Sequence, residues 1–314
     1  MEPRGGIKFI ASNIDIPEDI LPFNISDDLI LRVASEAEIE KLNQHYQKTY
    51  GLLAKFVVPF NTVPEKYDDG DGRRGIRYVE TNRTRCWVIT FEGFNGKAED
   101  LNPIAKLLKP KIHFSNTLIF NNHRQLDDSG FIFGPGASVD LYVRESRKDI
   151  AILSKDELNK LKRYYSHFEK NELAHVQDAI DLYESSSKLD DESALLTLSY
   201  FSIIESLITH KPRLTETLDS ITHQIKNKIK LLSKRFEIKP MQDEIFGGIA
   251  EANLWKKLYQ LRSNIAHGQV YDFSGELKCL RELQNVNSFL DEVVRELIKL
   301  AIEEPALVAD IREC

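Results

Sequence analysis

The sequence predicts an α+β protein in which a strand-rich mixed N-terminal domain is followed by an all-α helical bundle. The first observation is a change in pattern near residue 153, where runs of β-branched and aromatic residues stop and helical periodicity begins. The second is that the earlier runs end at Gly, Asn, Asp or Pro, whereas the later segments are long and joined by short polar links. We therefore expect one domain at residues 1–150 and a second at residues 151–314.

The composition is that of an ordinary globular protein, with 42% hydrophobic and 29% charged residues. No apolar run reaches the roughly 18 residues of a membrane span, and the N-terminus does not have the pattern of a secretory signal. The three cysteines, Cys86, Cys279 and Cys314, are too widely spaced for a disulfide framework or a zinc site. We therefore expect a cytoplasmic protein that does not associate with a membrane. The net charge of −7 excludes a generic, strongly basic nucleic-acid binder but allows a local basic patch.

Residues 1–150 carry three strand signals and one helix signal. Strands are expected within 83–93, 116–122 and 129–143, and a helix is expected from about Glu36 to Tyr50. Residues 65–75, rich in Gly and Asp, are expected to form a mobile loop between strands. Because this half lacks a recognisable set of nucleophile, base and orienting group, we expect it to sense or position a partner.

Residues 151–314 show helix after helix. The first begins with Ser154 and Glu157 at capping-box spacing. Further helices are expected at 171–186, 192–210, 217–236, 253–268 and 274–304. The last of these carries an apolar stripe from Leu277 to Leu300, which offers surface for packing within one chain and between chains.

The helix at 253–268 ends in the segment LRSNIAHG, which places two potential cations in its last turns. Gly268 follows as the expected C-cap. Arg262 and His267 lie five positions apart, so their side chains point about 140° away from each other around a regular helix. The plain interpretation makes Arg262 a surface cation that favours the helix C-terminus and His267 a polar helix-end residue. The functional interpretation is that both act on one phosphate, which requires either that the helix end unwinds at Gly268 or that a second chain completes the site.

Two further features bear on such a site. Glu205 lies in a helix that is otherwise apolar on most faces, so its carboxylate is expected to have a partner, and Arg262 could form a bidentate pair with it. The alternative is an exposed glutamate on a thin polar face. A basic run follows at 224–239, and we expect it either to guide an RNA backbone or to form a solvated helix face. Its candidate RNA-binding residues are Lys226, Lys228, Lys230, Lys234 and Arg235.

The helical half resembles the HEPN superfamily, and within it the Apea-like HEPN group, over residues 153–304. The resemblance rests on the apolar third helix with Glu205, the basic fourth helix, and an R-x4-6-H motif before a long final helix. In this chain the motif runs from Arg262 to His267. Family members often carry Asn, Asp or His directly after the arginine, whereas this chain has Ser263 there and Asn264 one position later.

The resemblance implies a metal-independent endoribonuclease without a cofactor, because many members with this motif cleave RNA as toxins or anti-phage effectors. It implies that His267 moves the proton and that Arg262 stabilises the phosphate charge. Asn264 is a candidate either to hydrogen-bond a phosphate oxygen or to orient His267, and Ser263 is a weaker candidate for the same role. It also implies a homodimer in which two motifs face each other across a two-fold axis. The alternative is a non-catalytic dimerisation or RNA-binding module. The RNA, the activating trigger and the need for an antitoxin or regulatory partner stay open.

Overall fold

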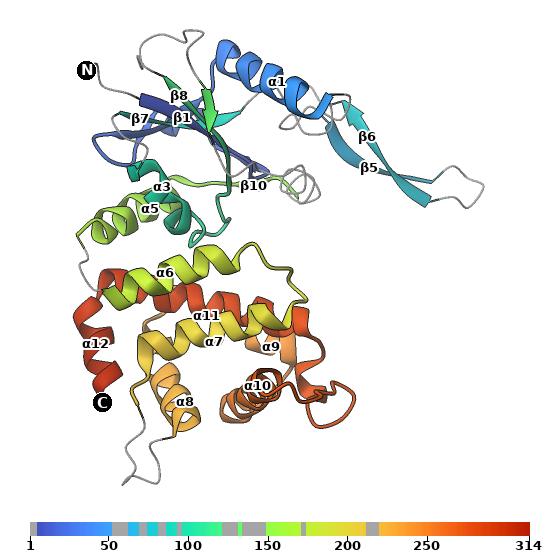
Figure 1. Cartoon of the computed structure of the whole chain (residues 1–314), viewed down its shortest axis with the longest axis vertical. Helices are drawn as coiled ribbons and strands as arrows, with labels where there is room; N and C mark the ends of the chain where they lie inside the picture. Colours follow the sequence, from blue (N-terminus) through green and yellow to red (C-terminus); the bar gives the residue numbers. More distant parts are fainter. Residues whose placement is uncertain are drawn as a thin grey trace. The chain divides into compact units, whose positions relative to one another are not determined.

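The computed structural model describes residues 5–51, 62–68, 74–80, 86–92, 96–120, 131–133, 149–170, 174–211 and 220–314 (Figure 1). The chain divides into two compact units, Met1–Ser166 and His167–Cys314, which we call the sheet unit and the helical unit. An antiparallel sheet in the first unit and helices in the second confirm the α+β class. The unit boundary lies one helix later than the sequence suggested, because most of α5 (Lys155–Phe168) belongs to the sheet unit.

The central sheet of the sheet unit has six strands in the order β3-β4-β7-β1-β8-β9, and every neighbouring pair is antiparallel. Its strands are β1 (Gly5–Ile10), β3 (Phe23–Asn24), β4 (Leu29–Val33), β7 (Trp87–Glu92), β8 (Phe114–Phe120) and β9 (Phe131–Phe133). The predicted strands at 83–93 and 116–122 correspond to β7 and β8. Of the predicted strand at 129–143, residues 131–133 form β9 and the rest lies outside the described residues.

Smaller elements complete this unit. A parallel pair joins β2 (Ile14–Asp15) to β10 (Ala151–Ile152), and a short 3-10 helix lies at Glu18–Ile20. Helix α3 (Gly96–Ala105) leads toward β8. Helix α5 begins as its Ser154–Glu157 spacing predicted, since the Glu157 backbone N–H donates to the Ser154 hydroxyl at 3.2 Å. Its buried residues are Leu158, Leu161, Tyr164, Tyr165 and Phe168.

The loop expected at residues 65–75 is largely replaced by a β-hairpin. Strand β5 (Thr62–Asp68) pairs with β6 (Arg74–Glu80) in an antiparallel register that places Tyr67 opposite Gly75. The prediction was therefore wrong for most of this segment, and its remaining residues, 69–73, lie outside the described part of the chain. The β-branched and aromatic residues on both sides favour strands, and these strands extend the ladder into the segment.

Helix α1 (Glu36–Tyr50) has the bounds that the sequence predicted, and its start is fixed by a capping box. The Glu38 backbone N–H donates to the Ser35 hydroxyl at 3.3 Å, and the Ser35 N–H donates to the Glu38 carboxylate at 2.7 Å. Arg32 on β4 adds two hydrogen bonds of 2.8 and 2.6 Å to the same carboxylate. Burial by itself raises the pKa of Glu38, but the hydrogen bonds from Arg32 and the Ser35 N–H outweigh it and lower the pKa below its usual 4.5.

Replacement of Glu38 by Gln is expected to lower the free energy of unfolding of the sheet unit by about 1–3 kcal/mol at pH 7. Because folding depresses the pKa, this contribution is present above pH 4.5 and is lost as the pH falls through the folded-state value. The difference between variant and wild type should therefore shrink toward pH 3. Urea unfolding followed by Trp87 fluorescence in a Trp255→Phe background measures it. Glu36→Gln, an exposed change in the same helical turn, is the control and should have little effect.

The helical unit is an all-α bundle, in which α7 packs against α6, α8, α10, α11 and α12 (Figure 1). Its α-helices are α6 (Ala174–Ser186), α7 (Ala194–Ile208), α8 (Ile221–Leu232), α9 (Gln242–Phe246), α10 (Glu251–Ala266), α11 (Leu283–Glu303) and α12 (Pro305–Glu313), with 3-10 turns η3 (Ser233–Arg235) and η4 (Lys278–Leu280). The predicted helix at 274–304 begins later than expected, at Leu283. Pro305 ends α11 and opens α12, as expected of a proline in a first helical turn.

Helix α11 is buried on all faces along its second half, where the sequence predicted a one-sided stripe. The apolar stripe is buried as predicted, but so are Asp291, Glu292, Arg295, Glu296 and Lys299. The chain itself therefore covers this stripe, and the expectation that it also offers apolar surface to a second chain was wrong. A helix buried on its polar side needs internal partners for its charges.

A buried hydrogen-bond network supplies some of these partners. The Asp291 carboxylate accepts from the phenol of Tyr183 at 3.0 Å, from the phenol of Tyr200 at 3.2 Å, and from the guanidinium of Arg295 at 3.0 Å. Burial and the nearby Asp291 charge raise the pKa of both tyrosines, so both phenols remain protonated donors. The network thus joins α6, α7 and α11 at one carboxylate.

Candidate functional site

The end of α10 has the geometry that the LRSNIAHG segment predicted. Gly268 has a φ of +64°, the left-handed conformation that glycine adopts without a Cβ penalty. Its N–H donates to the Ile265 carbonyl at 3.1 Å, and the Gln269 N–H donates to the Asn264 carbonyl at 2.8 Å. These two bonds form a Schellman motif, which ends the helix with His267 as its C-cap residue.

Arg262 of α10 is positioned by an ion pair with Glu205 of α7 and by the aromatic ring of Tyr259. Its Nη2 donates to Oε2 of Glu205 at 3.0 Å, and both side chains are only partly exposed, at 27% and 22%. The guanidinium also lies over the ring of Tyr259, with its carbon 5.6 Å from the ring centroid. Sequence reasoning named Glu205 as the partner of Arg262, and the structure brings the two together.

Arg262 and Glu205 form one of the two hydrogen bonds that a bidentate pair can form. Among the described residues, Nε of Arg262 and Oε1 of Glu205 are buried atoms without a hydrogen-bond partner. One bond therefore fixes the guanidinium, whereas the expected fork-to-fork geometry would use two. The unused donor and acceptor lie at the seam between α7 and α10, where a small shift of the side chains can join them in a second hydrogen bond.

Tyr259 is a member of this site that sequence reasoning missed. Its ring meets Phe201 of α7 edge-to-face with centroids 6.1 Å apart, which fixes the surface on which the guanidinium rests. A signal was present, because Tyr259 precedes Arg262 by three positions and residues at that spacing are neighbours on a helix.

His267 stands apart from this pair. Its side chain is exposed beyond the last turn of α10, and within the described ranges no hydrogen bond or ion pair joins it to Arg262. Ser263 and Asn264 are half-buried. Their backbone carbonyls accept hydrogen bonds from the N–H groups of His267 and Gln269, and among the described residues their side chains form no hydrogen bond to Arg262 or His267. One chain thus brings Arg262, Glu205 and Tyr259 together and leaves His267 presented to solvent.

The basic residues of α8 and η3 separate into three groups. Lys226, Lys230 and Lys234 recur every four residues along one face, where Lys226 is half-buried and the other two are exposed. Lys228 is buried on another face and donates to the Arg312 carbonyl at 3.0 Å. Arg235 forms an ion pair of 2.6 Å with Glu304. Lys228 is therefore not available to RNA, which corrects its assignment, because a spacing of two residues turns it into the bundle.

Within the described residues, no group of three or more His, Cys, Asp or Glu side chains is arranged to hold a metal ion. None of the helices in the described ranges is long and apolar enough to cross a membrane.

Comparison of the chain with protein-family models, with curated proteins and with solved structures finds no match.

Proposed function

We propose that this protein is a metal-independent endoribonuclease of the HEPN type, with Arg262 and His267 as its catalytic residues. The observation that carries the proposal is the end of α10. A charged guanidinium is positioned there by Glu205 and Tyr259, and five residues later an exposed imidazole stands at a sharply defined helix end. A fixed cation and a proton-transfer group are what phosphodiester transesterification requires.

The proposed reaction is attack of an RNA 2′-hydroxyl on its own phosphodiester. His267 accepts the proton of the 2′-hydroxyl as O2′ bonds to phosphorus, and Arg262 stabilises the charge that develops on the phosphorane oxygens. The bond from phosphorus to O5′ then breaks, O5′ takes up a proton from water, and the protonated His267 returns its proton to water. The products are a 2′,3′-cyclic phosphate and a 5′-hydroxyl. In this proposal, Asn264, or less effectively Ser263, orients the phosphate or the imidazole.

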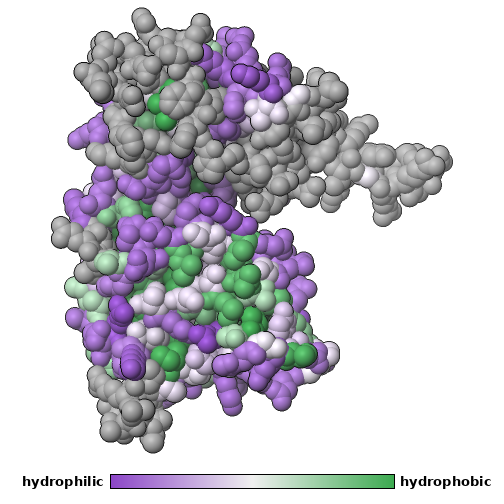
Figure 2. All heavy atoms as spheres, viewed as in Figure 1, coloured by the Kyte–Doolittle hydropathy of each residue, from purple (hydrophilic) through white to green (hydrophobic). Residues whose placement is uncertain are grey.

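A second copy of the chain would bring the two catalytic groups to one centre. Within one chain, Arg262 is tied to α7, and His267 is turned away by its position on the helix. The outer face of α7 carries Leu195, which is 62% exposed, and half-buried Leu198 on the same side as Glu205. Apolar side chains gather on the visible face of the helical unit, where α6 and α7 run (Figure 2). A homodimer built on this face would place Arg262 near its two-fold axis.

The cellular role that fits such an activity is that of a cytoplasmic toxin or anti-phage effector. Its substrate is RNA, and an antitoxin or other regulatory partner would restrain it. The sheet unit would sense the trigger or position the substrate.

One observation favours a second candidate, a non-catalytic module for dimerisation or RNA binding. The charge of Arg262 is already paired with Glu205, and an ion pair of this kind is also found where its sole role is to connect two helices, here α10 and α7. In this alternative, His267 is an ordinary helix-end residue. Cleavage assays separate the two candidates, because the module would bind RNA without shortening it.

The purified protein is expected to cleave single-stranded RNA in excess EDTA at an undiminished rate, because the proposed reaction uses an imidazole and a guanidinium in place of a metal-bound water. Mass spectrometry of the fragments should show 2′,3′-cyclic phosphate and 5′-hydroxyl ends. RNA carrying 2′-O-methyl groups is the control and should stay intact, since it lacks the attacking hydroxyl. Loss of cleavage on chelation, or 5′-phosphate ends, would contradict this mechanism.

A further inference from the structure

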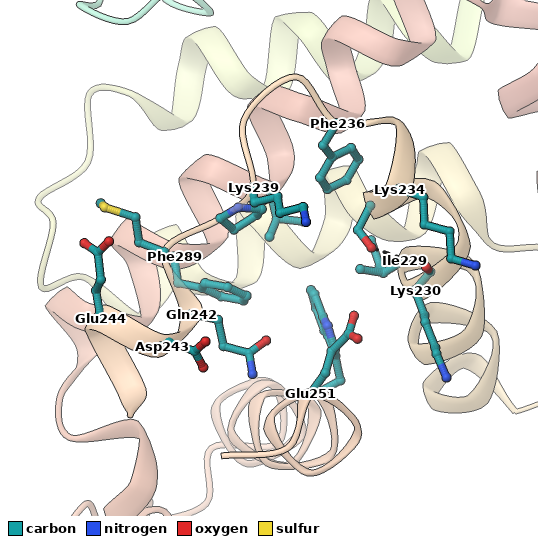
Figure 3. Close-up of a pocket in the computed structure, with 15 residues that line it drawn as sticks. Ile229, Lys230, Lys234, Phe236, Lys239, Gln242, Asp243, Glu244, Glu251 and Phe289 are labelled. Carbon is teal, nitrogen blue, oxygen red and sulfur yellow. Dashed lines mark hydrogen bonds between the residues drawn. The ribbon is translucent and has the colours of Figure 1, made fainter. Parts of the chain in front are cut away.

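The helical unit contains a cavity of about 820 Å³ near the opposite end of α10 from the Arg262 site. It is lined by the end of α8, the 3-10 turn η3, residues 236–241, α9, the start of α10 and the middle of α11 (Figure 3). Trp255 of α10 lines it, and the rise of a helix puts on the order of 18 Å along the α10 axis between Trp255 and His267. The cavity is thus a separate site on the same helix.

Two carboxylates of α11 fix one wall of the cavity. Oε2 of Glu296 accepts from the Ile238 backbone N–H at 3.2 Å, and Oε2 of Glu292 accepts from the Met241 N–H at 2.8 Å. The Gln242 side chain donates to the Ile249 carbonyl at 2.8 Å and so ties the start of α9 to the loop before α10. Charge-assisted bonds of this kind hold the backbone in place, so the cavity is preformed.

The floor is apolar, and one aromatic ring remains accessible above it. Ile229, Trp255, Phe289 and Val293 line the cavity and are buried. Phe236 is half-buried, and its ring is turned toward the cavity (Figure 3). A planar apolar group of a ligand can therefore lie against the Phe236 ring.

The cavity is lined by charges of both signs. Lys230, Lys234 and Lys239 are exposed, and no carboxylate in the described part of the chain is paired with them. The ammonium of Lys239 points into the cavity, whereas Lys230 and Lys234 lie along its rim (Figure 3). Three carboxylates also line the cavity, those of Asp243, Glu244 and Glu251, again without a paired cation among the described residues.

These features select the chemistry of the ligand. Lysine ammonium groups bind phosphate as point charges, and carboxylates accept hydrogen bonds from the amino groups of bases and from sugar hydroxyls. Aromatic rings stack on unpaired bases in single-stranded RNA. A nucleotide of an RNA strand carries an anion, a planar face and N–H donors in one unit. We infer that this cavity holds one unpaired nucleotide of the RNA substrate and acts as an exosite for the Arg262–His267 centre.

This inference rests on the proposed function for the identity of the substrate. It adds Phe236, Lys239 and Glu251 to the residues that select the RNA, and none of them takes part in the cleavage step. Changes in the exosite are therefore expected to raise KM and to leave kcat unchanged, because they remove binding that is equal in the ground state and the transition state.

The first test measures RNA affinity against salt, using full-length His267→Ala protein and a fluorescent 12-nucleotide single-stranded RNA. Replacement of Lys230, Lys234 and Lys239 by Ala is expected to weaken binding roughly tenfold or more and to lower the salt slope by roughly 0.7 for each lost phosphate contact. The matched control replaces Lys211, Lys256 and Lys278, which are exposed lysines of the same unit outside the cavity. An equal loss of affinity and slope in both triple variants would overturn the exosite.

The second test addresses the base. Phe236→Ala is expected to weaken binding about fivefold or more while the salt slope stays the same, because stacking involves no counterion release. In the same His267→Ala background, the protein should prefer oligo(C) over oligo(U), since cytosine has an amino group for a carboxylate, and adding Glu251→Gln should narrow that preference. Unchanged affinity in Phe236→Ala, or an unchanged preference in Glu251→Gln, would contradict a nucleotide in the cavity.

Two further arms identify the source of the nucleotide and separate this inference from the proposed function. Free 5′-mononucleotides are compared with RNA as competitors at equal nucleotide concentration. If the mononucleotides displace the labelled RNA as effectively as unlabelled RNA does, the cavity binds a free nucleotide and the RNA exosite is overturned. A protein that binds RNA through the cavity but never cleaves it contradicts the endoribonuclease alone. A protein that cleaves RNA with the same KM after the triple lysine change contradicts the exosite alone.

Discussion

The His267→Ala variant is expected to cleave RNA roughly 10²–10⁴-fold more slowly than the wild type, because it lacks the group that moves the proton of the 2′-hydroxyl. The imidazole is exposed and follows the last turn of α10, so its removal should leave the fold and the melting temperature almost unchanged. Single-turnover cleavage of a labelled RNA measures the effect. His223→Ala, a change of the same residue type in the first turn of α8, is the control.

Arg262 variants should lose activity for a different reason. Arg262→Ala removes the phosphate-stabilising cation, whereas Arg262→Lys keeps the charge and loses the planar fork of donors. The lysine variant is therefore expected to retain more activity than the alanine variant. Wild-type rates in His267→Ala or in Arg262→Ala would remove that residue from the proposed mechanism, and the binding-module alternative would then explain the structure.

Mixing the two inactive variants tests whether the cleft is shared between chains. If each centre takes its arginine from one chain and its histidine from the other, half of the dimers in an equal mixture are mixed, and each contains one intact centre of two. The mixture should therefore recover about one quarter of the wild-type activity. A monomeric mass in light scattering, or a mixture as inactive as its components, would contradict the shared cleft.

The Asp291→Ala variant is expected to lose about 3–5 kcal/mol of stability, because it leaves the buried guanidinium of Arg295 without this counter-charge. The same change removes the acceptor shared by the Tyr183 and Tyr200 phenols. Urea unfolding followed by the fluorescence of Trp255, in a Trp87→Phe background, reports on the helical unit.

Tyr200→Phe provides the matched comparison for this network. It removes one donor and leaves Asp291 with Tyr183 and Arg295, so it should cost only about 1 kcal/mol. An Asp291→Ala loss no larger than that of Tyr200→Phe would show that the carboxylate does not hold the network together.

The sequence by itself determined those features that depend on neighbouring residues. Helix α1 has its predicted bounds because Ser35 and Glu38 form a capping box within one turn. Helix α10 ends where Gly268 supplies the left-handed conformation that a Schellman motif requires. Local hydrogen bonds of this kind involve residues a few positions apart, so their partners can be identified in the sequence.

Only the tertiary structure decided which side chains meet across long separations. Arg262 and Glu205 are 57 positions apart, and the sequence could name the pair but not that it would form through one bond. The same limit applies to Lys228, which lies within the basic run of the sequence but is buried and donates a hydrogen bond to the Arg312 carbonyl. The cavity beside α8 could not be predicted at all, because its wall depends on hydrogen bonds that backbone N–H groups 51 and 58 residues away donate to the α11 carboxylates. Burial of the polar side of α11 has the same cause: periodicity identifies the apolar face, but packing by distant helices decides whether the other face meets water.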